Sequence, residues 1–233
     1  MANIKSKIAI VTGGASGLGF ELVKQLVMLD YVVCVVDLDK SKLSQIKEKF
    51  GDKVIVQLGN IANQDFAISV VEKSNEIGEI SLLINNGGSP AFKDPEDYSD
   101  VDVDKCFEGL KGMIYFSGAV LPRMKEQGGK IINILSSAAL RGNSKESVYC
   151  ATKWGERGYT EALRKSCDGT AAHIFAVYPG GIDTDFYKDS RSYVSIEKQQ
   201  SFMKAEEVAS VIIRNIVEID SLYVDDIVIN RIK

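Results

Sequence analysis

The sequence predicts an α/β fold in which one doubly wound parallel sheet of about seven strands carries helices on both faces. Three observations predict it. Short runs rich in β-branched residues alternate with amphipathic stretches along the whole chain, as in a parallel sheet with crossover helices. Most of these runs are continuously apolar, which is typical of strands buried on both faces. The connections between them are long enough for one helix each. We therefore expect one domain over residues 1–233.

Each predicted strand is a short apolar run, and each predicted helix repeats apolar residues at helical spacing. The strands, in order, are Ser6–Thr12, Tyr31–Asp37, Val54–Leu58, Ser81–Asn85, Lys130–Leu135, His173–Tyr178 and Tyr223–Ile229. The helices are Leu18–Leu29, Lys40–Phe50, Gln64–Ile77, Val103–Gln127, Ser147–Lys165 and Ala205–Glu218. Only the segment Ile182–Met203 is long and without clear periodicity. Loops of this length are usually lids or binding loops, so we expect it to cover the substrate.

Composition excludes several classes of function. His173 is the only histidine, so a multi-histidine zinc site is impossible and we expect no metal site. The net charge of −4 and the scattered basic residues argue against nucleic acid as a partner. Four cysteines without CxxC spacing are expected to be neutral thiols in a reducing cytoplasm. No apolar run approaches the roughly 18 residues of a membrane span, so we expect no membrane partner and no signal peptide.

A glycine-rich loop, Thr12–Gly19, joins the first strand to the first helix. Its glycines allow a tight turn and a close approach to a pyrophosphate, and the helix N-terminus offers free N–H groups to that anion. The second strand ends at Asp37, where a carboxylate can accept hydrogen bonds from the adenosine ribose hydroxyls. Asp37 would also repel a 2′-phosphate, although Lys40 lies close by in the sequence. We therefore expect NAD(H) as the cofactor in preference to NADP(H).

Tyr149 and Lys153 stand one turn apart on one face of a predicted helix. A phenol with an ordinary pKa of about 10 must be activated to exchange a proton near neutrality, and a nearby ammonium supplies energy of that order. Lys153 is therefore placed to activate Tyr149, and it can also hydrogen-bond the nicotinamide ribose. Ser136, at the end of the fifth strand, is placed to orient the substrate oxygen beside Tyr149.

In these motifs the chain resembles the classical short-chain dehydrogenase/reductase (SDR) family, from about Lys5 to the C-terminus. The motifs are Thr12–Gly19, Asn85-Asn86-Gly87-Gly88, Ser136, Tyr149 with Lys153, and Pro179–Thr184. The resemblance implies a Rossmann-type fold, reversible hydride transfer between a nicotinamide cofactor and a small alcohol or carbonyl, and a homodimer or homotetramer. It implies a catalytic role for Ser136, Tyr149 and Lys153. The cofactor contacts that it implies are Gly13, Ser16, Gly17, Leu18 and Gly19 at the pyrophosphate, Asp37 at the ribose, Asn60 and Ile61 at adenine, Asn86 near the ribose, and Pro179, Ile182 and Thr184 at the nicotinamide.

Three positions depart from the family pattern. Asn60 stands where an aspartate is common, and Gly88 replaces an alanine, and both are small changes. Gly109 stands where an asparagine normally kinks the helix and holds a water that links the lysine to solvent. Either the glycine preserves the kink while a water or a neighbouring group replaces the amide, or catalysis is slowed or altered.

Two other functions stay open from the sequence. One is an NADPH-dependent 3-oxoacyl carrier-protein reductase, against which Asp37 argues. The other is a cofactor-sensing binding protein with weakened catalysis, which Gly109 motivates. Phe186, Tyr187 and Tyr193 in the long loop are expected either to line an aromatic-tolerant pocket or to pack on one another in a lid.

Overall fold

The fold is known from a computed structural model that describes residues 7–188, 190, 193–219 and 221–232. In this part of the chain seven parallel strands form one sheet in the order β3-β2-β1-β4-β5-β6-β9. The strands are β1 (Lys7–Thr12), β2 (Val32–Asp37), β3 (Val54–Leu58), β4 (Glu79–Asn85), β5 (Gly129–Ile134), β6 (Ala172–Pro179) and β9 (Asp226–Ile229). This is the doubly wound, Rossmann-type order, and the predicted fold class is confirmed.

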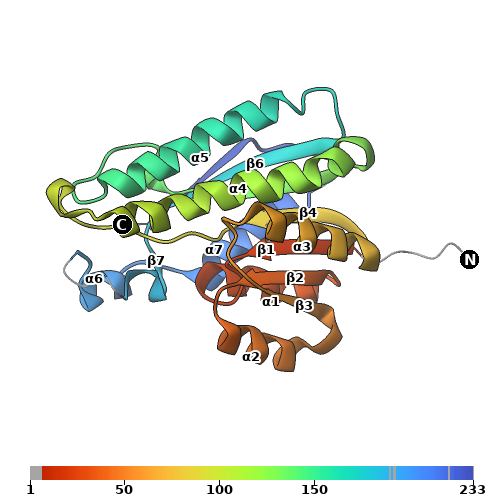
Figure 1. The fold of residues 1–233 in the computed structure, drawn as a ribbon, viewed down its shortest axis with the longest axis horizontal. Coiled ribbons are helices and arrows are strands. Elements are labelled where there is room, and N and C mark those ends of the chain that lie inside the picture. Colours follow the sequence, from red (N-terminus) through yellow and green to blue (C-terminus); the bar gives the residue numbers. More distant parts are fainter. Residues whose placement is uncertain (1–6, 189, 191–192, 220, 233) are drawn as a thin grey trace, which may run out of the picture.

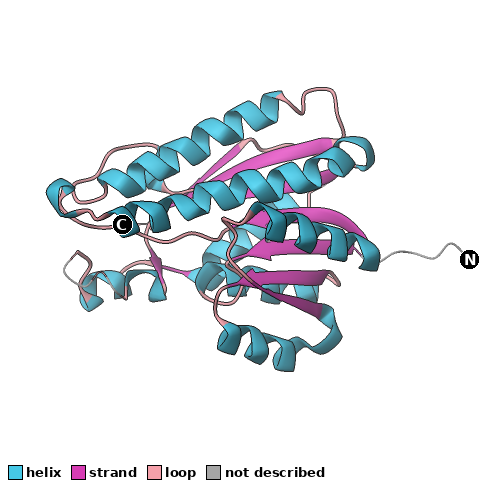
Figure 2. Ribbon diagram, in the orientation of Figure 1, coloured by secondary structure: helices cyan, strands magenta, loops and turns pink. Residues whose placement is uncertain are grey.

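Helices cover both faces of the sheet (Figures 1 and 2). The helices are α1 (Gly17–Met28), α2 (Lys40–Phe50), α3 (Gln64–Ile77), α4 (Asp100–Gln127), α5 (Ser147–Lys165), α6 (Ile196–Gln200) and α7 (Ala205–Ile212). Alternate strand residues point to opposite faces, so each strand contributes to two apolar layers. Ala9 and Val11 pack with α1, α2 and α7, whereas Ile8 and Ile10 pack with α3, α4 and α5.

Element boundaries differ from the predicted ones at a few places. Helix α4 begins three residues earlier than predicted, because Ser99 and Asp102 form a capping box ahead of the apolar pattern. The predicted last strand begins at Tyr223, but β9 begins at Asp226, and the Tyr223 hydroxyl instead donates to the Ile174 carbonyl of β6. Helix α7 continues as a π-helical turn, Ile213–Val217. The predicted strand start at Ser6 lies outside the described residues.

The long segment predicted as an irregular loop contains short elements. Strand β7 (Ile182–Asp183) pairs in parallel with β8 (Met203–Lys204), and α6 lies between them. These elements are too short to leave a periodic signal in the sequence. The β7–β8 pairing brings the two ends of the segment together, so that the described residues between them form a flap beside the main sheet (Figure 1).

Two expectations about the whole chain can be compared with the structure. The cysteines Cys34, Cys106, Cys150 and Cys167 are free and buried, as the sequence predicts. Burial raises the pKa of each of these thiols, which keeps them neutral. Among the described residues, no helix combines the length and the apolar character that crossing a membrane requires.

Candidate active site

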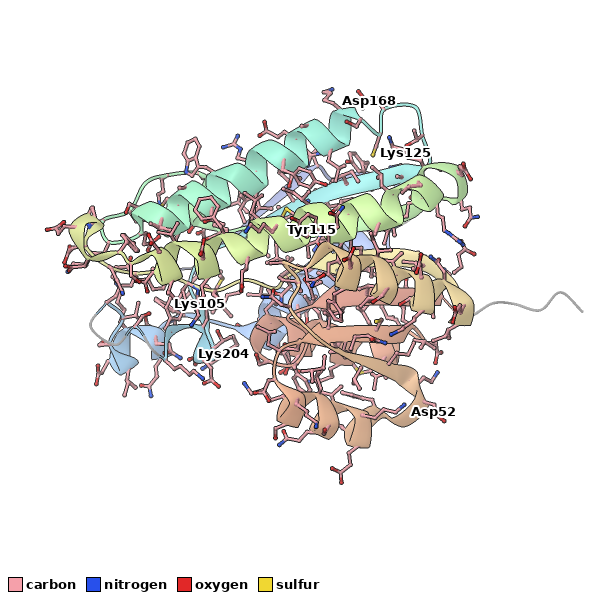
Figure 3. All side chains as sticks on the ribbon, in the orientation of Figure 1. Asp52, Lys105, Tyr115, Lys125, Asp168 and Lys204 are labelled. Atoms are coloured by element: carbon pink, nitrogen blue, oxygen red, sulfur yellow. The ribbon has the colours of Figure 1, made fainter. Side chains whose placement is uncertain are left out.

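A cleft with a volume of about 810 Å³ lies at the carboxyl ends of the strands. Of the predicted site residues, only Gly19 does not line it. Those that do are Gly13, Ser16, Gly17, Leu18, Asp37, Asn60, Ile61, Asn86, Ser136, Tyr149, Lys153, Pro179, Ile182 and Thr184. Lys105 of α4 also lines the cleft, on the side where the β7–β8 segment lies (Figure 3). Residues that are far apart in the sequence therefore meet in one place.

The glycine loop is closed by contacts that only glycines permit. Gly17 opens α1 with a φ of +54°, a left-handed conformation that favours glycine. A Cβ at Gly19 would lie 2.1 Å from the Gly13 carbonyl oxygen, so Gly19 acts in the turn itself rather than at the cleft surface. Ser16 is the N-cap of α1, yet its hydroxyl makes no capping hydrogen bond. The N–H groups at the start of α1 and this hydroxyl are therefore available to an anion in the cleft.

Asp37 ties the glycine loop to the end of β2. Its carboxylate accepts hydrogen bonds from the backbone N–H groups of Ala15 (3.0 Å), Leu38 (2.8 Å) and Asp39 (3.1 Å). A carboxylate has about four acceptor positions, so the group keeps capacity for a ligand hydroxyl. The same carboxylate therefore shapes the loop and lines the cleft.

Two asparagines support the cleft from the neighbouring loops. The Asn86 amide donates to the carbonyl oxygens of Thr12 and Gly13, both at 3.1 Å, and so fixes the loop after β4 against the loop after β1. The Asn60 amide donates to Glu108 of α4 at 2.8 Å, and its oxygen accepts from the Ala62 N–H at 2.8 Å. Both side chains are held in place before any ligand binds.

Ser136, Tyr149 and Lys153 come together at the wall formed by β5 and α5. Ser136 caps a short 3₁₀ turn and accepts a hydrogen bond from the Ala138 N–H at 3.1 Å. Tyr149 is buried in the first turn of α5, and the Lys153 Nζ atom lies 5.8 Å from the centre of its ring. Lys153 is held by the Ile134 carbonyl of β5 at 3.3 Å. The structure thus places the predicted serine, tyrosine and lysine side by side.

The surroundings of Tyr149 oppose its ionisation. Burial raises the pKa of Tyr149 well above its usual range, while a hydrogen bond with Ser136 opposes the increase. The charges of Glu156 and Glu146 raise this pKa further. The phenol is therefore held as a proton donor in these surroundings, and positive charge brought close to it would favour the phenolate.

Aromatic side chains close the cleft above Tyr149. Phe92 meets the Tyr149 ring edge-on at 5.4 Å between ring centres, stacks on Tyr187 at 5.8 Å and contacts Tyr193 at 4.7 Å. Phe186 packs against Tyr149 at 6.0 Å. Phe186 and Tyr187 meet edge-on at 5.4 Å between ring centres, and Phe186, Tyr187 and Tyr193 all line the cleft.

Three functional candidates were not singled out from the sequence: Phe92, Glu146 and Glu156. Phe92 lies in an irregular segment where no periodicity marks it. Glu146 accepts hydrogen bonds from Asn143 and from the Tyr193 hydroxyl of the flap, a partner that is remote in sequence. Glu156 had a signal, because its spacing places it on the same helix face as Tyr149 and Lys153.

Comparison with known proteins identifies the family of the chain. A family model for short chain dehydrogenases matches residues 7–194. The chain belongs to the classical short-chain dehydrogenase/reductase family. It is therefore a member of a family of oxidoreductases, as its motifs predict.

Among relatives of this SDR chain, an uncharacterized oxidoreductase of Staphylococcus saprophyticus is 32% identical over 79% of the chain and 78% of its own length. The 3-oxoacyl-acyl-carrier-protein reductase FabG of Thermotoga maritima is 31% identical over 90% of each chain. Among solved structures, a serine dehydrogenase complexed with NADP⁺ matches with a TM-score of 0.87 at 24% identity, over 95% of this chain and 94% of that one. An SDR of Burkholderia phymatum in complex with NAD matches with a TM-score of 0.86 at 20% identity, over 98% and 90%.

Proposed function

We propose that this protein is an NAD(H)-linked oxidoreductase that interconverts an alcohol and the corresponding carbonyl compound. The observation that carries the proposal is the shared cleft. Ser136, Tyr149 and Lys153 line one part of it, and the glycine loop and Asp37 line another. A dinucleotide has its phosphates between an adenosine and a reactive ring, so one cleft with both sets of residues suits it.

The residues present fit a nicotinamide dinucleotide. The open N-terminus of α1 with Ser16 would hold the pyrophosphate, and Asp37 would hold the adenosine ribose. The remaining contacts are those that the family resemblance implies. They are Gly13, Gly17 and Leu18 at the phosphates, Asn60 and Ile61 at adenine, Asn86 near the ribose, Tyr149 and Lys153 beside the reactive end, and Pro179, Ile182 and Thr184 at the nicotinamide. Gly19 serves the phosphate site by shaping the turn behind these contacts. When bound, the nicotinamide supplies or accepts the hydride.

The side chains divide the proton chemistry among them. During reduction, Tyr149 donates its hydroxyl proton to the carbonyl oxygen, and during oxidation the phenolate takes the proton of the alcohol. The Lys153 ammonium stabilises that phenolate by its charge. Ser136 donates a hydrogen bond to the substrate oxygen and so holds it beside Tyr149. Burial of Tyr149 and the aromatic rings above it exclude water from the reacting oxygen.

Replacement of Tyr149 by phenylalanine tests the proposal. The variant removes only the hydroxyl, so we expect alcohol or carbonyl turnover to fall by about a thousandfold or more, while NADH affinity stays near that of the wild type. Tyr159→Phe is the matched control, because Tyr159 lies on the same helix and its hydroxyl donates to the Ile114 carbonyl at 3.5 Å. Full turnover in Tyr149→Phe would refute the assignment.

The preference for NAD(H) rests on the charge of Asp37. A 2′-phosphate beside this carboxylate would be repelled, which favours NADH over NADPH in a fluorescence binding titration. Lys42 also lines the cleft, and its positive charge would attract a 2′-phosphate once Asp37 is neutralised. We therefore expect Asp37→Asn to lower the ratio of NADH affinity to NADPH affinity. Tighter binding of NADPH by the wild type would contradict the preference.

A second candidate is reduction of a 3-oxoacyl group on a carrier protein, which the resemblance to the Thermotoga maritima reductase favours. Turnover of 3-oxoacyl thioesters with NADPH, at a rate above that of simple ketones with NADH, would support it. A cofactor-sensing protein with weakened catalysis would bind NADH yet turn over neither substrate class.

The proposal extends to the setting of the protein. Residues in or directly after β1, β2, β3, β4, β5 and β6 line one cleft, in keeping with a single domain over residues 1–233. Its free buried thiols suit the reducing cytoplasm. The substrate is a small molecule, and we expect a homodimer or homotetramer, as is usual in this family.

A further inference from the structure

Glu156 is a buried acid that the chemistry described so far does not use. Glu156 is 1% exposed, although it lies in the middle of a helix that has a solvent-exposed side. Ionised carboxylates are rarely buried this deeply unless they are paired. Glu156 follows Lys153 by three residues and Tyr149 by seven, so all three share one face of α5.

The partner of Glu156 is the lysine of the proposed catalytic group. The Glu156 Oε2 atom lies 2.7 Å from Lys153 Nζ, and both side chains are almost fully enclosed. The second contact of the ammonium is the Ile134 carbonyl at 3.3 Å. Lys153 is therefore held between a carboxylate of its own helix and a carbonyl of β5. Burial raises the pKa of Glu156, and the charge of Lys153 opposes that rise.

The position of Glu156 is itself fixed by a hydrogen-bond chain to the sheet. Asn133 of β5 donates to the Thr160 hydroxyl at 2.9 Å, and Thr160 donates to the Glu156 backbone carbonyl at 2.7 Å. All three residues are buried. The chain fixes the α5 backbone at Glu156 against β5, the strand that also supplies the second contact of Lys153.

Gly109 of α4 leaves the space that the Glu156 carboxylate occupies. A Cβ at position 109 would lie 3.3 Å from Glu156 Oε1, and equally close to the Gly87 carbonyl oxygen and to Gly88 Cα. A larger side chain at this point would compete with the carboxylate for the same volume. The glycine on α4 and the buried acid on α5 are therefore complementary.

We propose that Glu156 is a positioning residue for the reaction: in the space left by Gly109, it holds the Lys153 ammonium in place and balances its charge beside Tyr149. This inference rests on the proposed roles of Tyr149 and Lys153. It answers the open question about Gly109, because a neighbouring acid stands at the place where a side chain from position 109 would reach. The acid acts through Lys153 and does not itself contact substrate.

The charge of Glu156 has a consequence for pH dependence. An anion in this place partly offsets the effect of Lys153 on Tyr149, and it raises the pKa of the phenol. The other titratable groups that face this cluster are Glu146 at the start of α5, Cys106 from α4 and Tyr187 from the flap. None of them carries a positive charge, so Lys153 is the cation that Glu156 balances within this cluster of described residues.

The decisive experiment is the pH profile of kcat/KM in Glu156→Gln. This variant keeps an acceptor for Lys153 and removes the negative charge, so we expect the limb assigned to Tyr149 to move to lower pH by about one unit. Glu156→Leu removes the acceptor as well, and we expect its kcat/KM to be about a hundredfold below that of Glu156→Gln, because the ammonium is no longer oriented. Glu161→Gln is the matched control, since Glu161 forms an exposed pair with Arg157 on the same helix. Its profile should equal that of the wild type.

A second readout does not depend on activity. Glu156→Leu leaves the Lys153 ammonium buried without a counter-charge, so we expect a Tm several degrees below the wild type, and the double variant with Lys153→Met should recover most of the loss. A Tm of Glu156→Leu equal to that of the wild type would overturn the proposal. The proposal would also be overturned if the Tyr149 limb of the pH profile in Glu156→Gln were unshifted or moved to higher pH. Equal kcat/KM values in Glu156→Gln and Glu156→Leu would overturn it as well.

The outcomes separate this inference from the proposed function. If Tyr149→Phe is inactive and Glu156→Gln behaves as the wild type at every pH, only the role of Glu156 fails. If Tyr149→Phe is fully active, the proposed function fails, whereas the Tm measurements still report whether Glu156 and Lys153 form a coupled pair.

Discussion

At Gly109 a side chain would be crowded by three neighbouring atoms. Glycine inside a helix costs about 1 kcal/mol relative to alanine, so a buried glycine in the middle of α4 needs a reason. The reason is the carboxylate of Glu156 on the neighbouring helix, which lies 3.3 Å from the position of a Cβ. Gly118, on the same helix, differs from it, because a Cβ there would meet nothing within 4 Å.

These two glycines give a paired prediction. Gly118→Ala should raise the free energy of unfolding by about 0.5–1 kcal/mol, because the helix gains propensity and nothing is crowded. Gly109→Ala should lower the free energy of unfolding. Its methyl group presses on Glu156 and on the loop after β4, and this crowding outweighs the gain in helix propensity. Urea denaturation measures both. Equal stabilisation by the two substitutions would show that position 109 is not crowded.

At the residue scale, functional side chains that are marked by their spacing along the chain could be predicted from the sequence. Side chains whose role depends on tertiary packing could not. Tyr149, Lys153 and Ser136 could be found because their spacing and strand-end position are readable along the chain. The spacing of Glu156 placed it on the helix face of Tyr149 and Lys153, but its burial could not be predicted, since burial depends on which side of α5 faces α4. The partnership of Glu146 with Tyr193 joins segments that no sequence spacing connects.

The N-terminus of α4 shows how a short polar pattern sets an element boundary. The Ser99 hydroxyl accepts from the Asp102 N–H, and the Asp102 carboxylate accepts from the Ser99 N–H at 2.9 Å. Lys93 adds an ion pair with the same carboxylate at 2.6 Å. The hydrogen bonds from Lys93 and Ser99 hold the pKa of Asp102 well below its usual range.

This cap predicts a contribution to acid stability. A carboxyl whose pKa is lower in the folded state stabilises the fold above its unfolded pKa of about 4, and the contribution is lost as the pH falls towards the folded value. The Tm of the wild type should therefore fall more steeply between about pH 5 and pH 2 than that of Asp102→Asn. Asp168→Asn, in an exposed pair after α5, is the control. Parallel curves for the wild type and Asp102→Asn would contradict the prediction.

The flap between β7 and β8 contains elements that are too short to be predicted from the sequence. Helix α6 is only five residues long and starts at a Ser195 cap, and each strand has two residues. Patterns this short carry no usable periodicity, whereas the longer helices and the buried strands repeat apolar residues often enough to be found. The flap is held by aromatic contacts with Phe92, which belong to the tertiary structure alone.

Across the whole molecule, the order of the strands places the proposed cofactor residues and the proposed catalytic residues in different parts of the cleft. β1 and β2 end at the glycine loop and at Asp37, and β5 ends beside Ser136. β4 lies between β1 and β5, so the loop after it touches both halves. This arrangement could be predicted from the alternation of strands and helices, because parallel crossovers leave few possible topologies. How closely α4 and α5 pack against each other could not be predicted, since this depends on the side chains between them.

The outward sides of α4 and α5 carry a prediction about assembly. Trp154 is 50% exposed and Ile114 38% exposed, and Tyr115 lies on the same helix as Ile114 (Figure 3). Gly158 adds a place where a second backbone can approach closely. If this surface joins two copies, Trp154→Glu should shift the protein towards the monomer in sedimentation velocity. Met28→Glu, at the exposed C-terminal end of α1, should not. An unchanged mass for Trp154→Glu would place the contact elsewhere.

Trp154 is the only tryptophan in the sequence, and it directly follows Lys153. All indole fluorescence of the protein therefore originates at one point, on the outer side of the helix whose inner side carries the proposed chemistry. Dilution that uncovers this ring would move its emission to longer wavelength, and energy transfer from the indole to NADH would report occupancy of the cleft. The native chain thus contains an optical probe for assembly and for cofactor binding, and no label has to be added.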